Sequence, residues 1–215
     1  MNQFDLLNSR IIACEKCPRL VTWRELVAIT KKRAYENEVY WGKPVPLFGD
    51  PSAKHLIVGL APAAHGANRT GQMFTGDRSG DWLFRALYKA GVANHSETQN
   101  RFDGMLLKDV MIAATAHCAP PENKPTPEEI QNCSQYLSEL IASRQWHSIL
   151  CLGNIAWQQV HRLLAIRPPK FGHGVFHSSD GCRLVASYHP SQQNTFTGRL
   201  TEPMLDSVIN QWLAI

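Results

Sequence analysis

The chain has 215 residues, 44% of them apolar, which is enough to bury one substantial core but too few for two independent ones. Its formal charge of +4 permits a polyanionic partner but excludes the strongly basic class of histone-like proteins. No apolar run reaches the roughly 18 residues of a membrane-spanning helix, and the N-terminus lacks the basic and apolar stretches of a signal peptide, so we expect one monomeric, cytoplasmic domain spanning residues 1–215.

Helix-length segments and short apolar strands alternate along the chain. We predict helical material over residues 6–26, before the first strand. Strands are then predicted over residues 55–60, 110–116, 149–152 and 183–188. The helices between and after them are predicted over residues 80–90, 127–143 and 154–164, with a last one from a Thr201 cap to near Trp212. Thr126 and Glu129 form a capping box that specifies one helix start. This alternation predicts an α/β fold, a three-layer α/β/α sandwich with a central parallel four-stranded sheet.

The six cysteines favour metal ligation, catalysis or burial over disulfide bonds in a protein that is not exported. Two residues separate Cys14 from Cys17, and fourteen separate Cys118 from Cys133. Four thiolates in this arrangement can hold zinc or a 4Fe-4S cluster, and spacing alone does not choose between them. Four free or buried thiols are the alternative. The remaining two cysteines, Cys151 and Cys182, lie in predicted strands, where cysteine ordinarily serves as a small buried apolar residue.

Several loops follow predicted strands, and parallel sheets bind ligands outside the carboxyl ends of their strands. These loops begin at Ala61, Cys118, Gly153 and His189, so at least three could converge on one crevice. The first is rich in small residues, which let a flat ligand approach the backbone. In it, Phe74 offers a face for stacking and Asp77 a carboxylate, although Asp77 could instead serve as a helix cap.

Three segments and the cysteine pattern resemble the uracil-DNA glycosylase superfamily, specifically family five, or type b. The segments are Gly59 to Gly80, Cys118-Ala119-Pro120-Pro121-Glu122-Asn123-Lys124-Pro125, and His189-Pro190-Ser191-Gln192-Gln193-Asn194-Thr195-Phe196. A lone His-Pro-Ser would be a weak signal, whereas this ordered set covers nearly the full chain. The resemblance implies a monofunctional glycosylase of base excision repair, and it favours a 4Fe-4S cluster over zinc at the four cysteines.

The resemblance also implies roles for three polar residues once a base has been flipped out of the duplex. His189 would donate a hydrogen bond to the carbonyl oxygen of the departing base. Asp77 and Asn123 would orient the water and stabilise the sugar cation. The alternatives are that His189 is a loop histidine with satisfied hydrogen bonds and that Asn123 is a turn residue in a proline-rich loop.

Two positions depart from the pattern of related branches. Those branches carry an Asp or Glu within the motif that reads Gly59-Leu60-Ala61-Pro62 here, so the usual carboxylate is missing. They also carry an Asn four residues before the third cluster cysteine, where this chain has Ala114. We expect Ala61, Phe74 and Ala114 to bind the base through an apolar wall. Such a wall discriminates weakly, which predicts release of hypoxanthine and xanthine beside uracil.

Contacts to the DNA strand are expected from the turn after His189 and from cations near the crevice. The residues are Pro190, Ser191, Arg78, Lys124 and Arg199. The stretch from Gln192 and Gln193 to Asn194 resembles the segment that fills the gap left by the flipped base, and a solvated polar loop is the alternative.

Two other function classes remain compatible with the residues. An iron-sulfur electron carrier or redox sensor would explain the cysteines but not Phe74, Asp77 or the His-Pro-Ser loop. A lesion-binding module without catalysis would use the same crevice to hold damaged DNA without releasing a base.

Overall fold

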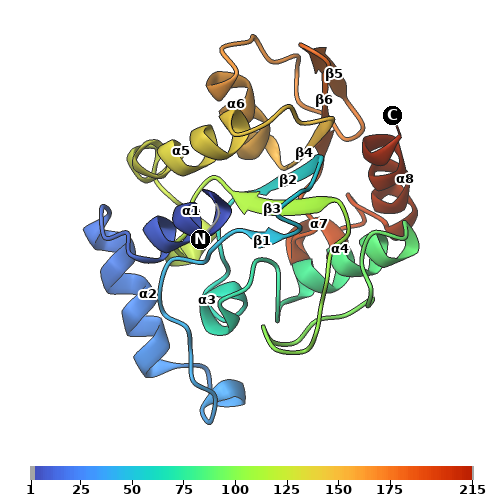
Figure 1. Cartoon of the computed structure of the whole chain (residues 1–215). Coiled ribbons are helices and arrows are strands. Elements are labelled where there is room, and N and C mark those ends of the chain that lie inside the picture. Colours follow the sequence, from blue (N-terminus) through green and yellow to red (C-terminus); the bar gives the residue numbers. More distant parts are fainter. Residues whose placement is uncertain (1–2, 215) are drawn as a thin grey trace.

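The computed structural model describes residues 3–214 and has a sheet of six strands at its centre, in the order β1-β3-β2-β4-β6-β5 (Figure 1). The four inner strands run parallel and are β3 (Val110–Ala114), β2 (His55–Gly59), β4 (Ser148–Leu152) and β6 (Cys182–Ser187). Every residue of β2, β3 and β4 is buried, which explains their largely apolar sequences. The four predicted strands are confirmed.

The sheet is mixed rather than wholly parallel, so the expectation of four parallel strands is incomplete. β1 (Phe48–Gly49) runs antiparallel to β3, and β5 (Phe176–Ser179) runs antiparallel to β6. With two residues, β1 is too short to give an apolar run. β5 is half-exposed and polar, and it joins β6 through Asp180 and Gly181, both at positive φ.

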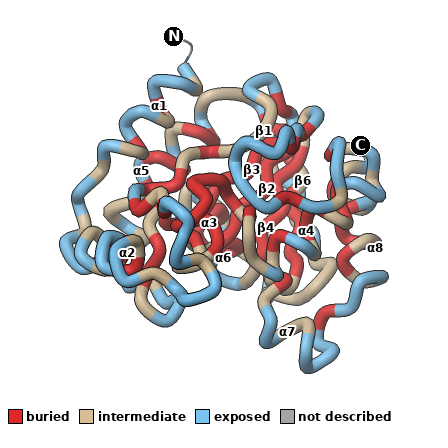
Figure 2. Tube along the Cα trace, turned by 90° about the horizontal axis from the view of Figure 1, so that it is seen from below, coloured by how far each residue is buried: buried red, intermediate tan, exposed pale blue. Residues whose placement is uncertain are grey.

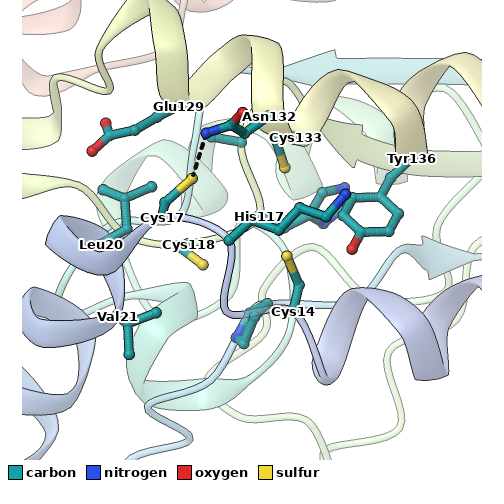
Figure 3. Close-up of a pocket in the computed structure, with 13 residues that line it drawn as sticks. Cys14, Cys17, Leu20, Val21, His117, Cys118, Glu129, Asn132, Cys133 and Tyr136 are labelled. Atoms are coloured by element: carbon teal, nitrogen blue, oxygen red, sulfur yellow. Dashed lines mark hydrogen bonds between the residues drawn. The ribbon is translucent and has the colours of Figure 1, made fainter.

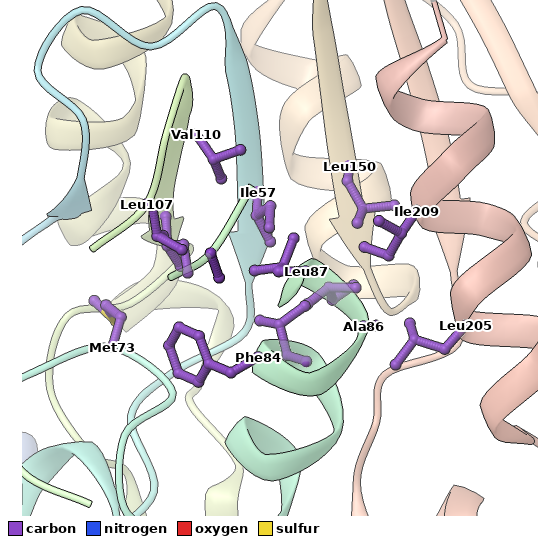
Figure 4. Close-up of a cluster of buried hydrophobic side chains, with 14 of the residues drawn as sticks. Ile57, Met73, Phe84, Ala86, Leu87, Leu107, Val110, Leu150, Leu205 and Ile209 are labelled. Carbon is purple, nitrogen blue, oxygen red and sulfur yellow. The ribbon is translucent and has the colours of Figure 1, made fainter. Parts of the chain in front are cut away.

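Helices pack on both faces of the sheet. α4 (Arg78–Lys89) and α8 (Glu202–Leu213) contribute to the core on one face, and α1 (Gln3–Ile12), α5 (Pro127–Ala142) and α6 (Asn154–Leu163) to the core on the other. Figure 4 shows the first core, in which side chains of α4 and α8 meet those of the strands: Phe84, Leu87, Leu205, Ile209, Ile57 and Leu150. The predicted capping box is present at the start of α5.

The helical material expected over residues 6–26 forms two helices, α1 and α2 (Pro18–Thr30). α2 begins with a proline in its first turn, and the break before it holds Cys14 and Cys17. Thr201 lies at the N-cap of α8, but its side chain accepts no hydrogen bond there. The short helical turns were not predicted: η1 (Arg33–Tyr35), α3 (Ala67–Thr70), η2 (Pro121–Asn123) and α7 (Gln192–Phe196).

The connections after two neighbouring strands diverge. β2 leads to α4 on one face of the sheet, whereas β4 leads to α6 on the other. Such a divergence opens a crevice at the carboxyl ends of the strands, the general ligand site of open α/β sheets. Figure 2 shows the buried strands surrounded by exposed loops, with α7 in a protruding, largely exposed segment. Within residues 3–214, no helix combines the length and apolar character needed to cross a membrane.

Candidate active site and cysteine cluster

A crevice of about 580 Å³ opens where the loops after β2, β3 and β6 meet. It brings together most of the predicted site residues: Ala61, Phe74, Asp77, Arg78, Ala114, Asn123, Lys124, His189, Ser191, Gln192 and Gln193. Two predicted residues, Pro190 and Arg199, do not line the crevice. Pro190 is buried, and the Arg199 guanidinium lies over the Tyr188 ring at 4.5 Å. Three loops far apart in sequence thus form one site.

Phe74 lies on the crevice wall in a backbone conformation with φ of 58°. Two glycines make room for it. A Cβ on Gly59 would meet the Phe74 ring at 2.9 Å, and one on Gly80 would meet the Phe74 carbonyl oxygen at 1.5 Å. The ring stacks on that of His189 with a centroid separation of 5.8 Å and an interplanar angle of 27°. The Phe74 and His189 rings are therefore in contact with each other on the crevice wall.

Asp77 lies at the N-cap of α4, where one carboxylate oxygen accepts a hydrogen bond from the Gly80 amide at 3.1 Å. The carboxylate also lines the crevice, so capping and a role in the site are compatible. Burial raises the pKa of Asp77, opposed by hydrogen bonds from the backbone of Gly80 and Ser79. A carboxylate with weakened solvation and a fixed orientation is suited to hold a water molecule.

The loop after β3 presents Asn123 to the crevice in a left-handed conformation, with φ of 57°. Glu122 before it also has positive φ, at 54°. Asparagine tolerates this region, but glutamate does so at a cost, and strain of this kind is concentrated at functional sites. The Asn123 side chain has no hydrogen-bond partner among residues 3–214, which leaves its amide available to a bound molecule.

His189 follows β6 and is half-buried in the crevice. Burial lowers the pKa of His189 to about 4, so its ring is neutral near pH 7. In the described part of the chain, neither ring nitrogen has a hydrogen-bond partner. The loop itself is braced, since the Asn194 side-chain amide donates to the His189 carbonyl oxygen at 2.8 Å. His189 is thus a fixed neutral ring that can donate a hydrogen bond into the site.

The wall beside these polar groups is largely apolar. Ala61 and Ala114 line it together with Met73 and Phe74. Ala114 is the last residue of β3 and is 2% exposed. A longer side chain at this position would project from a buried strand end toward the crevice, so the residue here affects the polarity of that wall.

The four cysteines with ligand spacing line a second cavity, next to α2 and α5. Figure 3 shows the sulfurs of Cys14, Cys17, Cys118 and Cys133 turned toward a common space. The first two come from the break between α1 and α2, the third follows β3, and the fourth lies in α5. The remaining pair is buried in the sheet as predicted, 0% exposed at Cys151 and 8% at Cys182.

Hydrogen-bond donors surround these sulfurs. The Arg24 guanidinium, 3% exposed, donates to the Cys118 sulfur at 3.1 Å and to the Cys14 carbonyl oxygen at 3.2 Å. The Asn132 amide lies 3.7 Å from the Cys17 sulfur. Burial raises the pKa of the Cys118 thiol to about 11 and that of the Cys133 thiol to about 12, so these thiolates require compensating positive charge.

Four thiols that face one cavity, with an arginine and an amide directed at two of the sulfurs, suit a centre held by thiolates. Among residues 3–214, no three His, Cys, Asp or Glu side chains are arranged to hold one metal ion. Zinc would draw all four sulfurs to within about 2.3 Å of one point. An iron-sulfur cluster instead takes four separate thiolates around a larger group, and sulfur-directed donors are part of such sites.

Comparison with known proteins decides the family. The profile described as Uracil DNA glycosylase superfamily matches residues 46–213. The chain belongs to this superfamily. It is 51% identical to the type-5 uracil-DNA glycosylase of Mycobacterium leprae over 208 residues, which cover 94% of this chain and 91% of the relative. The type-5 uracil-DNA glycosylase of Pyrobaculum aerophilum is 44% identical, with 97% and 91% covered.

More distant members of the superfamily also match. The type-4 uracil-DNA glycosylase of Archaeoglobus fulgidus is 26% identical over 175 residues, covering 78% of this chain and 79% of the relative. The identities separate the two branches clearly. The resemblance to family five is confirmed.

Two supporting residues of this uracil-DNA glycosylase fold escaped the sequence analysis. Arg69 is 6% exposed and ties the first loop together, donating to the carbonyl oxygens of His65 at 2.9 Å and Gly76 at 3.1 Å and pairing with Glu38. Gly66 lies against the Asp77 carboxylate. Neither stands out from the sequence, because both act through contacts that only the folded loop creates.

Gly66→Ala is expected to lower base release by about 100-fold, because small displacements of catalytic groups have effects of that size. The added Cβ would lie 2.2 Å from an Asp77 carboxylate oxygen, so the carboxylate would have to shift. Single-turnover cleavage measures the effect, with Gly172→Ala as a control at a glycine away from the crevice. Equal rates for both variants would contradict the positioning role of Gly66.

Proposed function

We propose that this protein hydrolyses the N-glycosyl bond of uracil and of other deaminated bases in DNA, using Asp77, Asn123 and His189. Membership in the superfamily and high identity to type-5 enzymes support uracil-DNA glycosylase activity in base excision repair. The observation that carries the residue assignment is the convergence of these three side chains, from three separate loops, on one largely apolar crevice.

The reaction adds water to the sugar carbon and transfers a proton to the departing base. As the bond breaks, positive charge develops on the sugar and negative charge on the base. Asp77 and Asn123 accept hydrogen bonds from the attacking water, and the Asp77 carboxylate also offsets the sugar cation. The neutral His189 ring donates to the base oxygen that gains charge, where a fixed donor in a dry site is most effective.

The aromatic and apolar walls hold the flipped base by stacking and packing. The Phe74 ring supplies the face on which the base stacks. Ala61 and Ala114 complete the wall, and their side chains cannot form hydrogen bonds. Such a wall does not reject a base for lacking a particular donor or acceptor. Hypoxanthine and xanthine are therefore substrates beside uracil in this proposal.

Ala114→Asn is expected to narrow this range. The amide would face the base edge and penalise bases that leave it unpaired, at a cost of about 1–3 kcal/mol for a buried polar group. The uracil rate relative to hypoxanthine and xanthine should therefore rise about 5- to 150-fold. The three rates are measured on DNA duplexes that differ only in the target base. Ala114→Ser is a control that introduces a smaller polar side chain. An unchanged ratio would remove Ala114 from the specificity argument.

The rim of the crevice is suited to a DNA strand. Arg78 and Lys124 lie there with exposed side chains, and Ser191 caps α7 at the point where a phosphate could approach. Arg199 is exposed nearby, next to Tyr188. Pro190 fixes the backbone between His189 and Ser191. These groups position the strand without reading its sequence, so binding should weaken as salt concentration rises.

A 4Fe-4S cluster is the second part of the proposal, with Cys14, Cys17, Cys118 and Cys133 as its ligands. When bound, it would supply positive charge to the four thiolates and join the N-terminal helices to α5 and the loop after β3. This loop also carries Asn123, so a cluster held by the four cysteines would help to fix the position of Asn123 in the crevice. Arg24 and Asn132 would donate hydrogen bonds to ligand sulfurs.

Arg24→Gln is expected to accelerate iron loss to a chelator by roughly 10- to 100-fold, the usual effect of removing a partner of a metal ligand. Iron content and visible absorption after anaerobic purification provide the measurement. Arg10→Gln is a matched control, because Arg10 pairs with Glu139 on the surface and touches no cysteine. Stoichiometric zinc in the purified protein would contradict the cluster assignment.

The direct test of the function uses a duplex with one uracil opposite guanine. Incubation with the protein should give an abasic site that alkali cleaves, free uracil, and no strand break before alkali. Tight binding without abasic product would favour a lesion-binding module. Reversible redox cycling without binding or product would favour an electron carrier.

A further inference from the structure

A buried arginine lies within the loop that connects β2 to α4 and carries Asp77. Arg69 belongs to α3, whose four residues are all buried, and is itself 6% exposed. Its side chain donates to the Gly76 carbonyl oxygen at 3.1 Å, in the residue directly before Asp77. Its backbone amide donates to the Gly66 carbonyl oxygen at 2.9 Å, and Gly66 lies against the Asp77 carboxylate. Arg69 is therefore bonded to two parts of the loop that adjoin Asp77.

The Arg69 guanidinium is fixed by a segment that is remote in sequence. It pairs with Glu38 and lies 4.0 Å from the centre of the Tyr35 ring. Each of its three nitrogens has a hydrogen-bond partner. A Cβ on Gly76 would lie 2.4 Å from Nη2 of Arg69, so the close approach of this charge depends on the glycine. The positive charge thus has a fixed position next to the residue that precedes Asp77.

The Asp77 carboxylate is poorly solvated, so nearby charges affect it strongly. Burial raises the pKa of Asp77, and the negative charge of Asp81 in α4 adds to the rise. Backbone hydrogen bonds from Gly80 and Ser79 and the positive charge of Arg69 oppose it. The other charged or titratable side chains around the crevice are Arg78, Glu122, Lys124 and His189. The first three are exposed, where solvent screens their charges, and the His189 ring is neutral. Arg69 is thus the buried positive charge that acts on Asp77.

We propose that Arg69 is a positioning residue for base release, which keeps the Asp77 carboxylate ionised and holds it where the water is activated. The inference rests on the proposed function and on the role of Asp77 in it. Arg69 does not line the crevice, so it acts through Asp77 and not on the base or the water. Glu38 reduces the effect of this charge only in part, because its side chain is 46% exposed.

The first experiment follows single-turnover release of uracil as a function of pH. The quantity compared is the pH at which the rate has fallen to half on the acid side, the acid midpoint. Arg69→Met removes the charge and should raise the acid midpoint by about one pH unit, the lower end of what an opposite charge contributes. Well below the midpoint, a shift of this size lowers the rate about 10-fold. Arg69→Lys keeps the charge and should leave the acid midpoint within about 0.3 pH unit, while the lost hydrogen bonds lower the rate at every pH.

Two further variants control for effects on the fold. Arg85→Met removes a partly buried arginine that pairs with Glu202 and Asp206 and does not line the crevice. It should leave the acid midpoint unchanged. Glu38→Gln keeps a hydrogen-bond acceptor for Arg69 at a half-exposed position but removes a negative charge. It should therefore move the acid midpoint in the opposite direction, toward lower pH.

A second measurement follows Asp77 without activity or DNA. Carbon NMR of carboxyl-labelled aspartate reports the titration, and the Asp77 signal is the one lost in Asp77→Asn. The signal should titrate about one pH unit higher in Arg69→Met than in the wild-type protein. Equal titration in the two proteins, or equal shifts of the acid midpoint in Arg69→Met and Arg69→Lys, would overturn the proposal.

If Arg69→Met does not fold, Glu38→Gln decides the question. An Asp77 signal or an acid midpoint that stays in place or moves to higher pH in Glu38→Gln would then overturn the proposal. Failure of the wild-type protein to release uracil would instead overturn the proposed function, and the NMR titration would still show whether Arg69 keeps Asp77 ionised.

Discussion

Asp77→Asn is expected to lower the rate of base release by about 10²- to 10⁴-fold, the usual contribution of a positioned acid or base. The amide keeps the shape of the carboxylate but loses the charge that orients water and offsets the sugar cation. The N-cap of α4 survives, since asparagine caps helices as well as aspartate does. Single-turnover kinetics with a uracil duplex measure the loss.

The same change should stabilise the folded protein at neutral pH. Burial raises the pKa of Asp77 above that of an unfolded aspartate, so the ionised carboxylate destabilises the native state once pH exceeds about 4. The loss of stability grows as pH rises toward the pKa of Asp77 in the folded protein, and it is constant at pH values above that pKa. Below pH 4 both states are protonated, and the advantage of Asn should disappear. A lower activity together with a higher Tm separates a functional effect from unfolding.

Asp81→Asn provides a matched control on the same helix. Its carboxylate lies in the first turn of α4 and does not line the crevice. The control should leave base release within about 2-fold, because a surface substitution away from the site has little effect. A fully active Asp77→Asn protein would show that the carboxylate only caps α4 and that another group activates the water.

His189→Ala is expected to lower base release by about 10²- to 10³-fold, the effect of deleting one fixed donor to a developing oxyanion. The Phe74 ring would also lose its stacking partner. His189→Gln restores an N–H donor and should recover part of the loss. The measurement is single-turnover release at saturating protein, so that weaker DNA binding does not enter. Similar rates for the Ala and Gln variants would indicate that the His189 ring contributes packing but no hydrogen bond to the base.

The pH dependence follows from the same two groups. Burial holds the pKa of His189 at about 4, so the ring stays neutral and its donor state is constant from pH 5 upward. Activity should instead fall on the acid side as Asp77 is protonated, at a pH above that of an ordinary aspartate because its pKa is raised. His189→Ala should lower the whole profile without moving this acid limb. If the fall in activity at low pH is absent in His189→Ala, then titration of His189 rather than of Asp77 causes it.

The sequence predicted the parts of the fold whose burial follows a simple pattern. The inner strands are buried runs of mostly apolar residues, and the Thr126 capping box identifies the start of α5. The edge strand β5 was missed, although Asp180-Gly181 before an apolar run is a strong hairpin signal. The break between α1 and α2 was missed because Cys14 to Cys17 contain no glycine, and Pro18 is as compatible with a helix start as with a kink.

The sequence predicted which residues line the crevice but not how their side chains are arranged. Placing its loops after parallel strands was enough to expect that Asp77, Asn123 and His189 would meet. The contact of Gly66 with Asp77, the left-handed Glu122 and the stack of Arg78 on Phe196 depend on tertiary packing between segments. Periodicity and motif spacing contain no information on such contacts, so these features appear only in the folded chain.

The central claim is that one crevice excises several deaminated bases with one set of groups. It is tested most directly by measuring release of uracil, hypoxanthine and xanthine from otherwise identical duplexes by the wild-type and Asp77→Asn proteins. We predict that the wild-type protein releases all three bases and that the substitution lowers all three rates by a similar factor. Release of uracil alone, or full retention of any one activity in Asp77→Asn, would contradict the account.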